Sequence, residues 1–342
     1  MTPGSEGRRL RVAVVGVGAF GRHHARVWSD LPGAELVAVA DTDPAAARAA
    51  GAKHGCAAVG DAADLPPGLD AVSVAVPTVS HAAVAVPLLR RGVACLVEKP
   101  FAACLGDGEA MLRAAAEGNA ILAAGHIERF NPAVIAVDRE PLRPRFMEVN
   151  RVAPFSFRSA DVGVVLDLMI HDLDLVLHLA GSEPVRVEAV GVPVLTPFED
   201  IANARIEFAD GCVADVTASR VATKVERKLR VFSEDAYMVL DFALRQGWTY
   251  RKSPGLTLER VMRLKEGAET LADLKDVVFG DLLRVEPVRI TEHEPLRAEL
   301  ASFLDAVRHR TRPVVSGEEG MAALRLALRV TEKIREGLPR RG

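Results

Sequence analysis

The chain has 342 residues, of which 49% are hydrophobic and 26% are charged, and its formal net charge is −3. This composition excludes an intrinsically disordered protein, and the near-neutral charge argues against a protein that binds nucleic acid or a membrane surface. A single hydrophobic core rarely extends over so many residues, so we expect two domains.

The cysteines and the first residues indicate a cytoplasmic protein. The four cysteines show no spacing typical of a metal or redox site, so we expect reduced thiols. The first ten residues lack the apolar stretch of a secretory signal peptide. Residues 71–89 contain no Asp, Glu, Lys or Arg, but Pro77, Ser80 and Pro87 favour a strand, a loop and a helix over a membrane span.

Residues 1–125 alternate short apolar runs with helical patterns. The predicted strands are Leu10–Val15, Leu36–Ala40, Ala71–Val76, Ala94–Val97 and Ala120–Ala123. The predicted helices are Phe20–Ser29, Pro44–His54, His81–Arg91 and Leu105–Glu117. Continuous apolar strands that alternate with helices indicate a parallel sheet covered on both faces. The sequence therefore predicts an α/β Rossmann domain over residues 1–125.

A GxGxxG pattern follows the first strand, formed by Gly16, Gly18 and Gly21 with Ala19 and Phe20 between them. Gly16 permits a tight turn, Gly18 leaves room for a pyrophosphate, and Gly21 lets the helix and strand pack closely. The pattern alone is weak evidence, but here a strand precedes it and a helix follows it, which is typical of a dinucleotide-binding site.

Asp41 indicates which dinucleotide binds. It stands at the end of the second predicted strand, about 20 residues after Gly21. A carboxylate at this place hydrogen-bonds the ribose hydroxyls of the adenosine half and repels a 2′-phosphate. Thr42 brings no compensating cation, so we expect NAD rather than NADP as the cofactor.

The fourth predicted strand ends in Glu98-Lys99-Pro100. Ligands of open parallel sheets bind at the carboxyl ends of the strands, so Lys99 is placed to hold a substrate oxygen. The spacing alone is equally compatible with a surface lysine beside a turn proline.

After residue 125 the pattern changes. A predicted helix, Val164–Leu179, is followed by Val-rich alternating runs that predict strands at Val185–Val192, Ala202–Phe208, Cys212–Ala218, Lys228–Phe232 and Tyr237–Leu240. This indicates an α+β domain over residues 126–295, built on an open, mostly antiparallel sheet. Residues 251–290 are weakly patterned and receive no assignment. Two amphipathic helices, Leu296–Arg308 and Glu318–Glu336, end the chain, and we expect residues 296–342 to pack back toward the Rossmann domain.

Asp167 and His171 are four residues apart in the predicted helix and therefore share a face. A carboxylate beside an imidazole raises its basicity and suits it to act as a general base on an alcohol. The same spacing is compatible with a zinc site or with a solvated polar face, although the intervening apolar residues argue for burial. His178, one turn beyond Asp174, is interpreted as a structural or capping residue.

Together these motifs resemble the glucose–fructose oxidoreductase / inositol dehydrogenase (Gfo/Idh/MocA) family. The resemblance rests on Gly16–Gly21, on Pro77 and Thr78 with His81, on Glu98–Pro100, and on the segments Glu294–Phe303 and Pro313–Gly317. It implies that Lys99, Asp167 and His171 are catalytic and that no metal is required. It also implies cofactor contacts from the glycine loop, Asp41, Pro77, Thr78, His81, Glu98 and Lys99.

Two segments narrow the substrate class. Residues 125–132 begin the second domain and are expected to line the cleft, with His126, Arg129 and Asn131 as substrate contacts. Residues 151–167 lead into the catalytic helix, and Arg151 and Arg158 can each present a bidentate fork to a diphosphate. Ordinary surface positions are an equal alternative for both arginines.

The two segments resemble the nucleotide-sugar branch of this family, the UDP-N-acetylglucosamine 3-dehydrogenases, which supply a 3-keto sugar for diamino-sugar lipid A. The resemblance implies oxidation of C3 of UDP-N-acetylglucosamine by a cytoplasmic homodimer or homotetramer. UDP-N-acetylglucosaminuronate and a free sugar or polyol such as myo-inositol are alternative substrates. A non-enzymatic NAD(P)-binding regulator is a further alternative, but such a regulator need not keep Lys99, Asp167 and His171, all present here.

Overall fold

The chain forms two compact units. The computed structural model describes residues 7–138, 142–156, 162–254, 257, 259, 262 and 282–337. The first unit comprises Met1–Phe130 and His293–Leu326, and the second comprises Asn131–Glu292 and Ala327–Gly342. Helix α9 (Pro295–His309) belongs to the first unit, whereas helix α10 (Gly317–Gly337) passes from the first unit into the second. Residues 296–342 were expected to form one C-terminal segment that packs toward the Rossmann domain. The boundary between the two units instead falls after Leu326, within α10.

A six-stranded parallel sheet forms the centre of the first unit, in the order β3-β2-β1-β4-β5-β6. Its strands are β1 (Leu10–Val15), β2 (Ala34–Ala40), β3 (Ala57–Val59), β4 (Ala71–Val74), β5 (Ala94–Glu98) and β6 (Leu122–Gly125). The order reverses between β1 and β4, and open α/β sheets bind ligands at the carboxyl ends of the strands at such a point. The predicted Rossmann architecture is confirmed.

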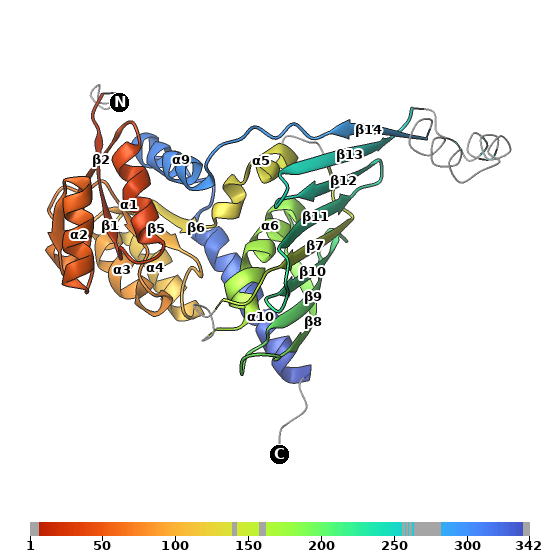
Figure 1. The fold of residues 1–342 in the computed structure, drawn as a ribbon, viewed down its shortest axis with the longest axis horizontal. Helices are drawn as coiled ribbons and strands as arrows, with labels where there is room; N and C mark the ends of the chain where they lie inside the picture. The colour runs from red at the N-terminus through yellow and green to blue at the C-terminus, as the bar shows by residue number, and fades with distance from the viewer. Residues whose placement is uncertain are drawn as a thin grey trace, which may run out of the picture. The chain divides into compact units, whose positions relative to one another are not determined.

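Helices connect these strands (Figure 1). They are α1 (Gly21–Asp30), α2 (Pro44–His54), α3 (His81–Arg90) and α4 (Leu105–Glu117), with the short 3₁₀ turns η1 (Ala62–Asp64), η2 (Thr78–Ser80) and η3 (Ile127–Phe130). Helix α2 shows why the local sequence folds in this way. Asp43 caps its first turn by accepting a hydrogen bond from the Ala45 amide, and Gly55 ends it in a left-handed conformation.

The core of the first unit includes part of the C-terminal region. Trp28 on α1 is fully buried and its indole N–H donates to the Ser73 hydroxyl at 2.8 Å. Leu300 and Phe303 on α9 belong to the same buried cluster as Trp28 and the strand residue Val12. Helix α9 therefore stabilises the Rossmann sheet directly.

The second unit is built on an eight-stranded sheet in the order β14-β13-β12-β11-β7-β10-β9-β8. Its strands are β7 (Phe146–Val152), β8 (Pro184–Val192), β9 (Ile201–Phe208), β10 (Val213–Ser219), β11 (Glu226–Phe232), β12 (Ala236–Asp241), β13 (Gln246–Lys252) and β14 (Leu283–Pro287). Only the β7–β10 pair is parallel among these strands. The prediction of a mostly antiparallel sheet is confirmed.

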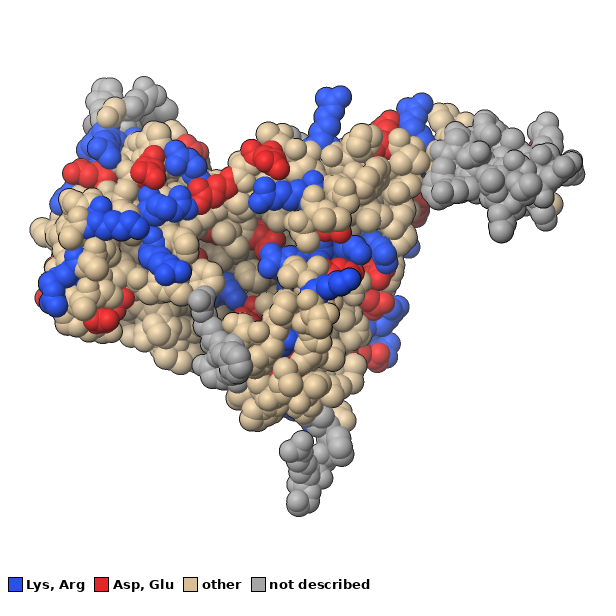
Figure 2. Space-filling view, viewed as in Figure 1, with Lys and Arg blue, Asp and Glu red and all other residues tan. Residues whose placement is uncertain are grey.

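Helix α6 (Ile170–Ala180) packs against β7 and β10 on one face of this sheet (Figure 1). A π-helical turn, η5 (Val165–Met169), precedes it, and a short helix, α5 (Pro132–Asp138), precedes β7. Basic and acidic side chains of the described residues are interspersed on the face seen in Figure 2. Among the helices that the structure describes, none combines the length and apolarity of a membrane span.

Some elements went unpredicted. β3 has only three residues, all at least partly exposed, so it gives no apolar run to detect. β7 alternates buried and half-buried positions and carries Glu148 and Arg151, which obscure its strand pattern. β13 and β14 lie partly in the region that received no assignment.

Candidate active site

The glycine loop leaves room for a ligand where the motif predicts one. Gly16 has φ +85°, and a Cβ on it would lie 2.6 Å from the Ala75 carbonyl oxygen. A Cβ on Gly21 would lie 1.7 Å from the Gly16 carbonyl oxygen. A Cβ on Gly18, in contrast, would meet nothing within 4 Å, so this position faces open space. Gly16 and Gly21 are therefore required by the fold, whereas Gly18 fits the close approach of a pyrophosphate.

Asp41 is fixed against this loop. Its Oδ2 accepts a hydrogen bond from the Val17 amide at 2.8 Å, and its Oδ1 accepts one from the Asp43 amide at 2.9 Å. Each oxygen keeps a second lone pair for a further donor such as a ribose hydroxyl. The carboxylate is thus already oriented at the end of β2.

His81, which follows Pro77 and Thr78, has a buried ring. Its Nε2 lies 3.0 Å from the Val76 carbonyl oxygen and its Nδ1 lies 3.3 Å from that of Phe101. Burial lowers the pKa of His81, and a neutral imidazole has a single N–H, so it bonds one of these carbonyls at a time. The ring thus links the segments that follow β4 and β5, and its predicted contact with the cofactor stays a prediction.

Glu98 ends β5, and the Lys99–Pro100 peptide bond is cis. His24 on α1 donates from Nε2 to Glu98 Oε1 at 2.9 Å, and the Lys99 amide donates to Oε2 at 3.3 Å. Burial by itself would raise the pKa of Glu98, but the hydrogen bond from His24 and the charges of His24 and Lys99 lower it below its usual value. Glu98 is therefore an ionised carboxylate directly beside Lys99.

The residues predicted as substrate contacts just after β6 have structural partners. His126 is fully buried, and the buried Arg129 forms an ion pair with the half-buried Glu319 of α10, from Nη2 to Oε1 at 3.1 Å. Asn131 caps α5 by accepting a hydrogen bond from the Ala133 amide at 3.0 Å. The contacts of Arg129 and Asn131 give these two residues a use in the fold, and the predicted substrate contacts of all three residues stay predictions.

Asp167 and His171 lie at the junction of η5 and α6, and both are half-buried. The π-helical turn inserts an extra residue into the helix there, a feature often found at functional sites. The Val164 amide donates to the Glu199 carbonyl oxygen at 2.9 Å and the Asp167 amide to that of Gly163 at 3.1 Å, which fix the start of the turn. The sequence predicted a helix here, but not this irregular turn.

Arg151, which was expected to contact a diphosphate, forms an ion pair within the second unit. Its Nε donates to Asp172 Oδ2 at 2.7 Å and its Nη2 to Oδ1 at 2.8 Å, and both side chains are buried. The Nε–Nη2 edge of the guanidinium thus holds α6 to β7, and the predicted contact of Arg151 with a diphosphate stays a prediction. Arg158, the other candidate, lies outside the described residues.

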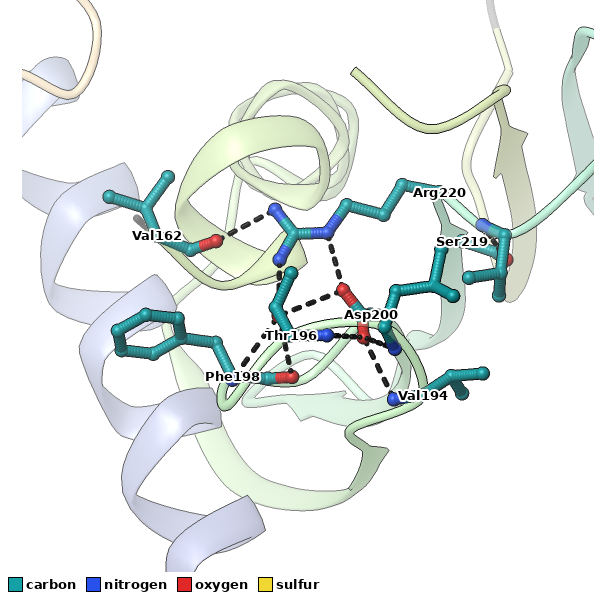
Figure 3. Close-up of polar contacts among 9 residues, drawn as sticks. Val162, Val194, Thr196, Phe198, Asp200, Ser219 and Arg220 are labelled. Carbon is teal, nitrogen blue, oxygen red and sulfur yellow. Dashed lines mark hydrogen bonds and ion pairs between the residues drawn. The ribbon is translucent and has the colours of Figure 1, made fainter. Parts of the chain in front are cut away.

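A second buried ion pair fixes the loop between β8 and β9 (Figure 3). Arg220 donates from Nε to Asp200 Oδ1 at 2.8 Å and from Nη1 to the Val162 carbonyl oxygen at 2.7 Å. Asp200 also accepts hydrogen bonds from the amides of Val194 and Thr196, at 2.8 and 2.9 Å. Because Val162 lies just before η5, this cluster positions the turn that carries Asp167.

No group of three or more His, Cys, Asp or Glu side chains suited to a metal ion occurs in the described ranges. Asp167 and His171 bring a carboxylate and an imidazole to the junction of η5 and α6. This arrangement suits proton transfer.

Comparisons with known proteins identify the family of this chain. The profile of an oxidoreductase family with an NAD-binding Rossmann fold matches residues 10–126, and the profile of the GFO/IDH/MocA C-terminal domain matches residues 136–239. UDP-N-acetylglucosamine 3-dehydrogenase of Acidithiobacillus ferrooxidans is 35% identical over 97% of this chain and 99% of its own length. The chain belongs to the Gfo/Idh/MocA oxidoreductase family.

Two further comparisons support the assignment. A solved structure of the same Acidithiobacillus enzyme superposes with a TM-score of 0.85 over 97% of this chain and 99% of that chain, at 35% identity. Inositol 2-dehydrogenase of Rhizobium meliloti is 31% identical over 63% of this chain and 70% of its own length. As a member of the Gfo/Idh/MocA family, the chain is an NAD-dependent dehydrogenase acting on a CH–OH group.

Sequence reasoning missed several residues that support the site of this Gfo/Idh/MocA protein. They are His24 and Glu299 in the first unit and Asp172, Asp200 and Arg220 in the second. Arg220 and Asp200 are 20 residues apart and Arg151 and Asp172 are 21 apart, so no local spacing pairs them. Burial of charged side chains is the signal that identifies them, and burial is visible only in the fold.

Proposed function

We propose that this protein oxidises the C3 hydroxyl of UDP-N-acetylglucosamine to the 3-keto sugar. The observation that carries the proposal is the full-length similarity to the UDP-N-acetylglucosamine 3-dehydrogenase of Acidithiobacillus ferrooxidans. The similarity extends over both units, so it includes the part of the chain that carries Asp167 and His171 as well as the cofactor domain.

The first unit supplies the cofactor site. The residues that would hold NAD are the glycine loop with Ala19 and Phe20, the carboxylate of Asp41, and the segments that carry Pro77, Thr78, His81 and Glu98. The open space at Gly18 and the fixed carboxylate of Asp41 fit the pyrophosphate and a ribose without a 2′-phosphate. When bound, NAD supplies the acceptor for the hydrogen and electron pair that leave the sugar carbon.

The protein's own residues handle the proton and the oxygen. His171 accepts the proton of the substrate hydroxyl, and Asp167 stabilises the imidazolium that results. Lys99 holds the oxygen that becomes the carbonyl, because an ammonium stabilises negative charge on that atom. Glu98 keeps the ammonium in place through its charge.

We propose that Arg158 and Arg151 recognise the diphosphate. Arg151 is held by Asp172 through its Nε and Nη2 donors, so its contact with a diphosphate would use the other edge of the guanidinium. His126, Arg129 and Asn131 shape the segment after β6, and we propose that they support the substrate contacts there.

We also propose a cytoplasmic homodimer or homotetramer that supplies a 3-keto sugar for diamino-sugar lipid A. The outer face of the second sheet supports the oligomer. Phe146, Phe232, Tyr237 and Tyr250 form a continuous row across four strands, with successive ring centroids 5.6, 4.5 and 5.3 Å apart. Aromatic rows that are only partly buried are typical of protein interfaces.

One other substrate class has a specific observation in its favour. The inositol 2-dehydrogenase of Rhizobium meliloti is 31% identical over its aligned part, so a free polyol is the second candidate. A polyol carries no diphosphate. The two candidates therefore differ in whether UDP alone competes with the substrate.

A substrate panel tests the proposal. Purified protein is incubated with NAD⁺ and, separately, UDP-N-acetylglucosamine, UDP-N-acetylglucosaminuronate, myo-inositol and glucose, and reduced cofactor is followed by absorbance. We expect turnover of UDP-N-acetylglucosamine, a product two mass units lighter, and inhibition by UDP. Turnover of myo-inositol without inhibition by UDP would replace the proposal by the polyol alternative.

A further inference from the structure

A buried carboxyl group on α9 lies close to the catalytic lysine segment. Glu299 is only 2% exposed, and within the described ranges neither of its carboxylate oxygens has a hydrogen-bond partner. It interacts electrostatically with Glu98, the residue before Lys99. The Glu98 side chain is itself 15% exposed, so a fully buried carboxyl group and a largely buried one, from segments about 200 residues apart, act on one another.

The partners of the two carboxyl groups differ. Glu98 accepts hydrogen bonds from His24 and from the Lys99 amide, and the charge of Lys99 acts on it. Glu299 has none of these contacts among the described residues. An ionised carboxylate that is buried without a donor is strongly destabilising, so the proton belongs on Glu299 and the negative charge on Glu98.

The charged groups on the elements that pack against α9 do not change this assignment. Helix α1 carries Arg22, His23, His24, Arg26 and Asp30, and η3 carries Glu128 and Arg129. Arg26 bonds Glu294 at the start of α9, and Arg129 bonds Glu319. Burial first, and the charge of Glu98 second, raise the pKa of Glu299 well above that of an ordinary glutamate.

We propose that Glu98 and Glu299 form a buried carboxyl pair that holds a single negative charge, on Glu98, with the proton on Glu299, and that this charge positions the ammonium of Lys99. The positioning of Lys99 rests on the proposed function. The protonation of Glu299 does not depend on it.

Unfolding as a function of pH tests the proton on Glu299. Unfolding exposes this carboxyl, which then releases its proton at any pH above its ordinary value of about 4.5, so rising pH favours unfolding. We expect the unfolding constant of the wild-type protein to rise relative to that of Glu299→Gln by up to about tenfold per pH unit above this value. Urea unfolding followed by the fluorescence of Trp28, in a Trp248→Phe background, monitors the first unit.

Glu332→Gln, at an exposed position on α10, is the matched control and should show no such trend. If the ratio of the unfolding constant of the wild-type protein to that of Glu299→Gln did not change with pH, the assignment of the proton to Glu299 would be overturned. A ratio that falls as the pH rises would also overturn it, because it would mean that Glu299 is ionised in the folded protein.

Infrared spectroscopy gives a second readout, and its first test uses the wild-type protein alone. Wild-type protein at neutral pH should show the carbonyl stretch of a protonated carboxyl group, and the band should disappear at alkaline pH. The band should persist in Glu332→Gln and be lost in Glu299→Gln. Absence of the band from the wild-type protein at neutral pH would contradict the proposal.

Glu98→Gln tests the positioning of Lys99. Removing the charge beside the ammonium should lower kcat and move the alkaline limb of its pH profile to lower pH by about one unit. A lower kcat with an unchanged pH profile would mean that Glu98 has only a structural role, and it would overturn the proposal that its charge positions Lys99. If the protein oxidised no sugar at all, the proposed function would fail while the unfolding and infrared results still decided the protonation of Glu299.

Discussion

Arg151 and Asp172 form a buried ion pair through two parallel hydrogen bonds, of 2.7 and 2.8 Å. Arg151 lies on β7, and Asp172 directly follows His171 on α6. The pair therefore fixes α6 to the sheet at the residue next to the proposed general base, His171. A side chain expected to bind substrate from its sequence context thus has a positioning use in the fold.

Replacing one residue of this ion pair should destabilise the fold strongly. Arg151→Met or Asp172→Asn should each lower the free energy of unfolding by about 3–5 kcal/mol, because the remaining charged or polar partner stays buried without its ion pair. The double variant should lose much less than the sum of the two. Urea denaturation of all four proteins measures this, and strictly additive losses would show that the two side chains do not act together.

Substitutions at two glycines of the cofactor loop should change different properties, NAD affinity at Gly18 and stability at Gly21. Gly18→Val should leave the Tm nearly unchanged and lower the affinity for NAD by about tenfold or more, since its side chain would enter only the open space. Gly21→Ala should instead destabilise the fold by about 1–3 kcal/mol, because its Cβ would overlap the Gly16 carbonyl. Calorimetric NAD titration and thermal unfolding distinguish the two, and a stable Gly18→Val protein with unaltered NAD binding would refute the loop assignment.

Asp167 and His171 should act as a unit. His171→Ala should lower kcat by about 10²–10⁴ with little change in NAD affinity, since general-base catalysis contributes this much. Asp167→Asn should have a similar effect, and the double variant should be far from additive. His178→Ala on the same helix is the control, and steady-state kinetics that show an equal loss in His178→Ala would argue against a specific acid–base pair.

The Asp200–Arg220 cluster should make stability depend on acid pH. Burial by itself would raise the pKa of Asp200, but hydrogen bonds from the amides of Thr196 and Leu195, then Arg220 and the Val194 amide, lower it well below its usual value. A lowered pKa in the folded state stabilises the protein above the ordinary value of about 4, and this contribution is lost as the pH falls.

The stability difference between the wild-type protein and Asp200→Asn should therefore be complete at pH 7 and shrink below about pH 4. Thermal unfolding at a series of pH values measures it. A difference that grows as the pH falls would mean that Asp200 is protonated in the folded protein.

The Rossmann half was predictable because its signals are local. β1 is apolar except for Arg11 and buried along nearly its whole length, and Gly16 to Gly21 connect it directly to α1. Likewise Asp43, Pro44 and Gly55 mark both ends of α2, which the sequence bounded correctly. Patterns of this kind depend on neighbouring residues alone.

The supporting residues of the site were not predictable in this way. Glu299 and Glu98 are about 200 residues apart, and nothing in the sequence near Glu299 separates a buried carboxyl group from an exposed glutamate of an amphipathic helix. The π-helical turn at Asp167 similarly depends on the contact between the Val164 amide and the Glu199 carbonyl, which the loop before β9 supplies. Such features follow from tertiary packing rather than from local pattern.

The central claim is oxidation at C3 of a UDP-linked sugar, and UDP-N-acetylglucosamine deuterated at C3 tests it most directly. The protein is supplied with NAD⁺ and either the labelled or the unlabelled sugar, and both products are analysed by mass spectrometry. We predict slower turnover of the labelled sugar, recovery of the deuterium in the reduced cofactor, and a 3-keto product without the label. Reduced cofactor that carries no deuterium, formed together with an oxidised sugar that keeps its label, would place the oxidation at another carbon and contradict the account.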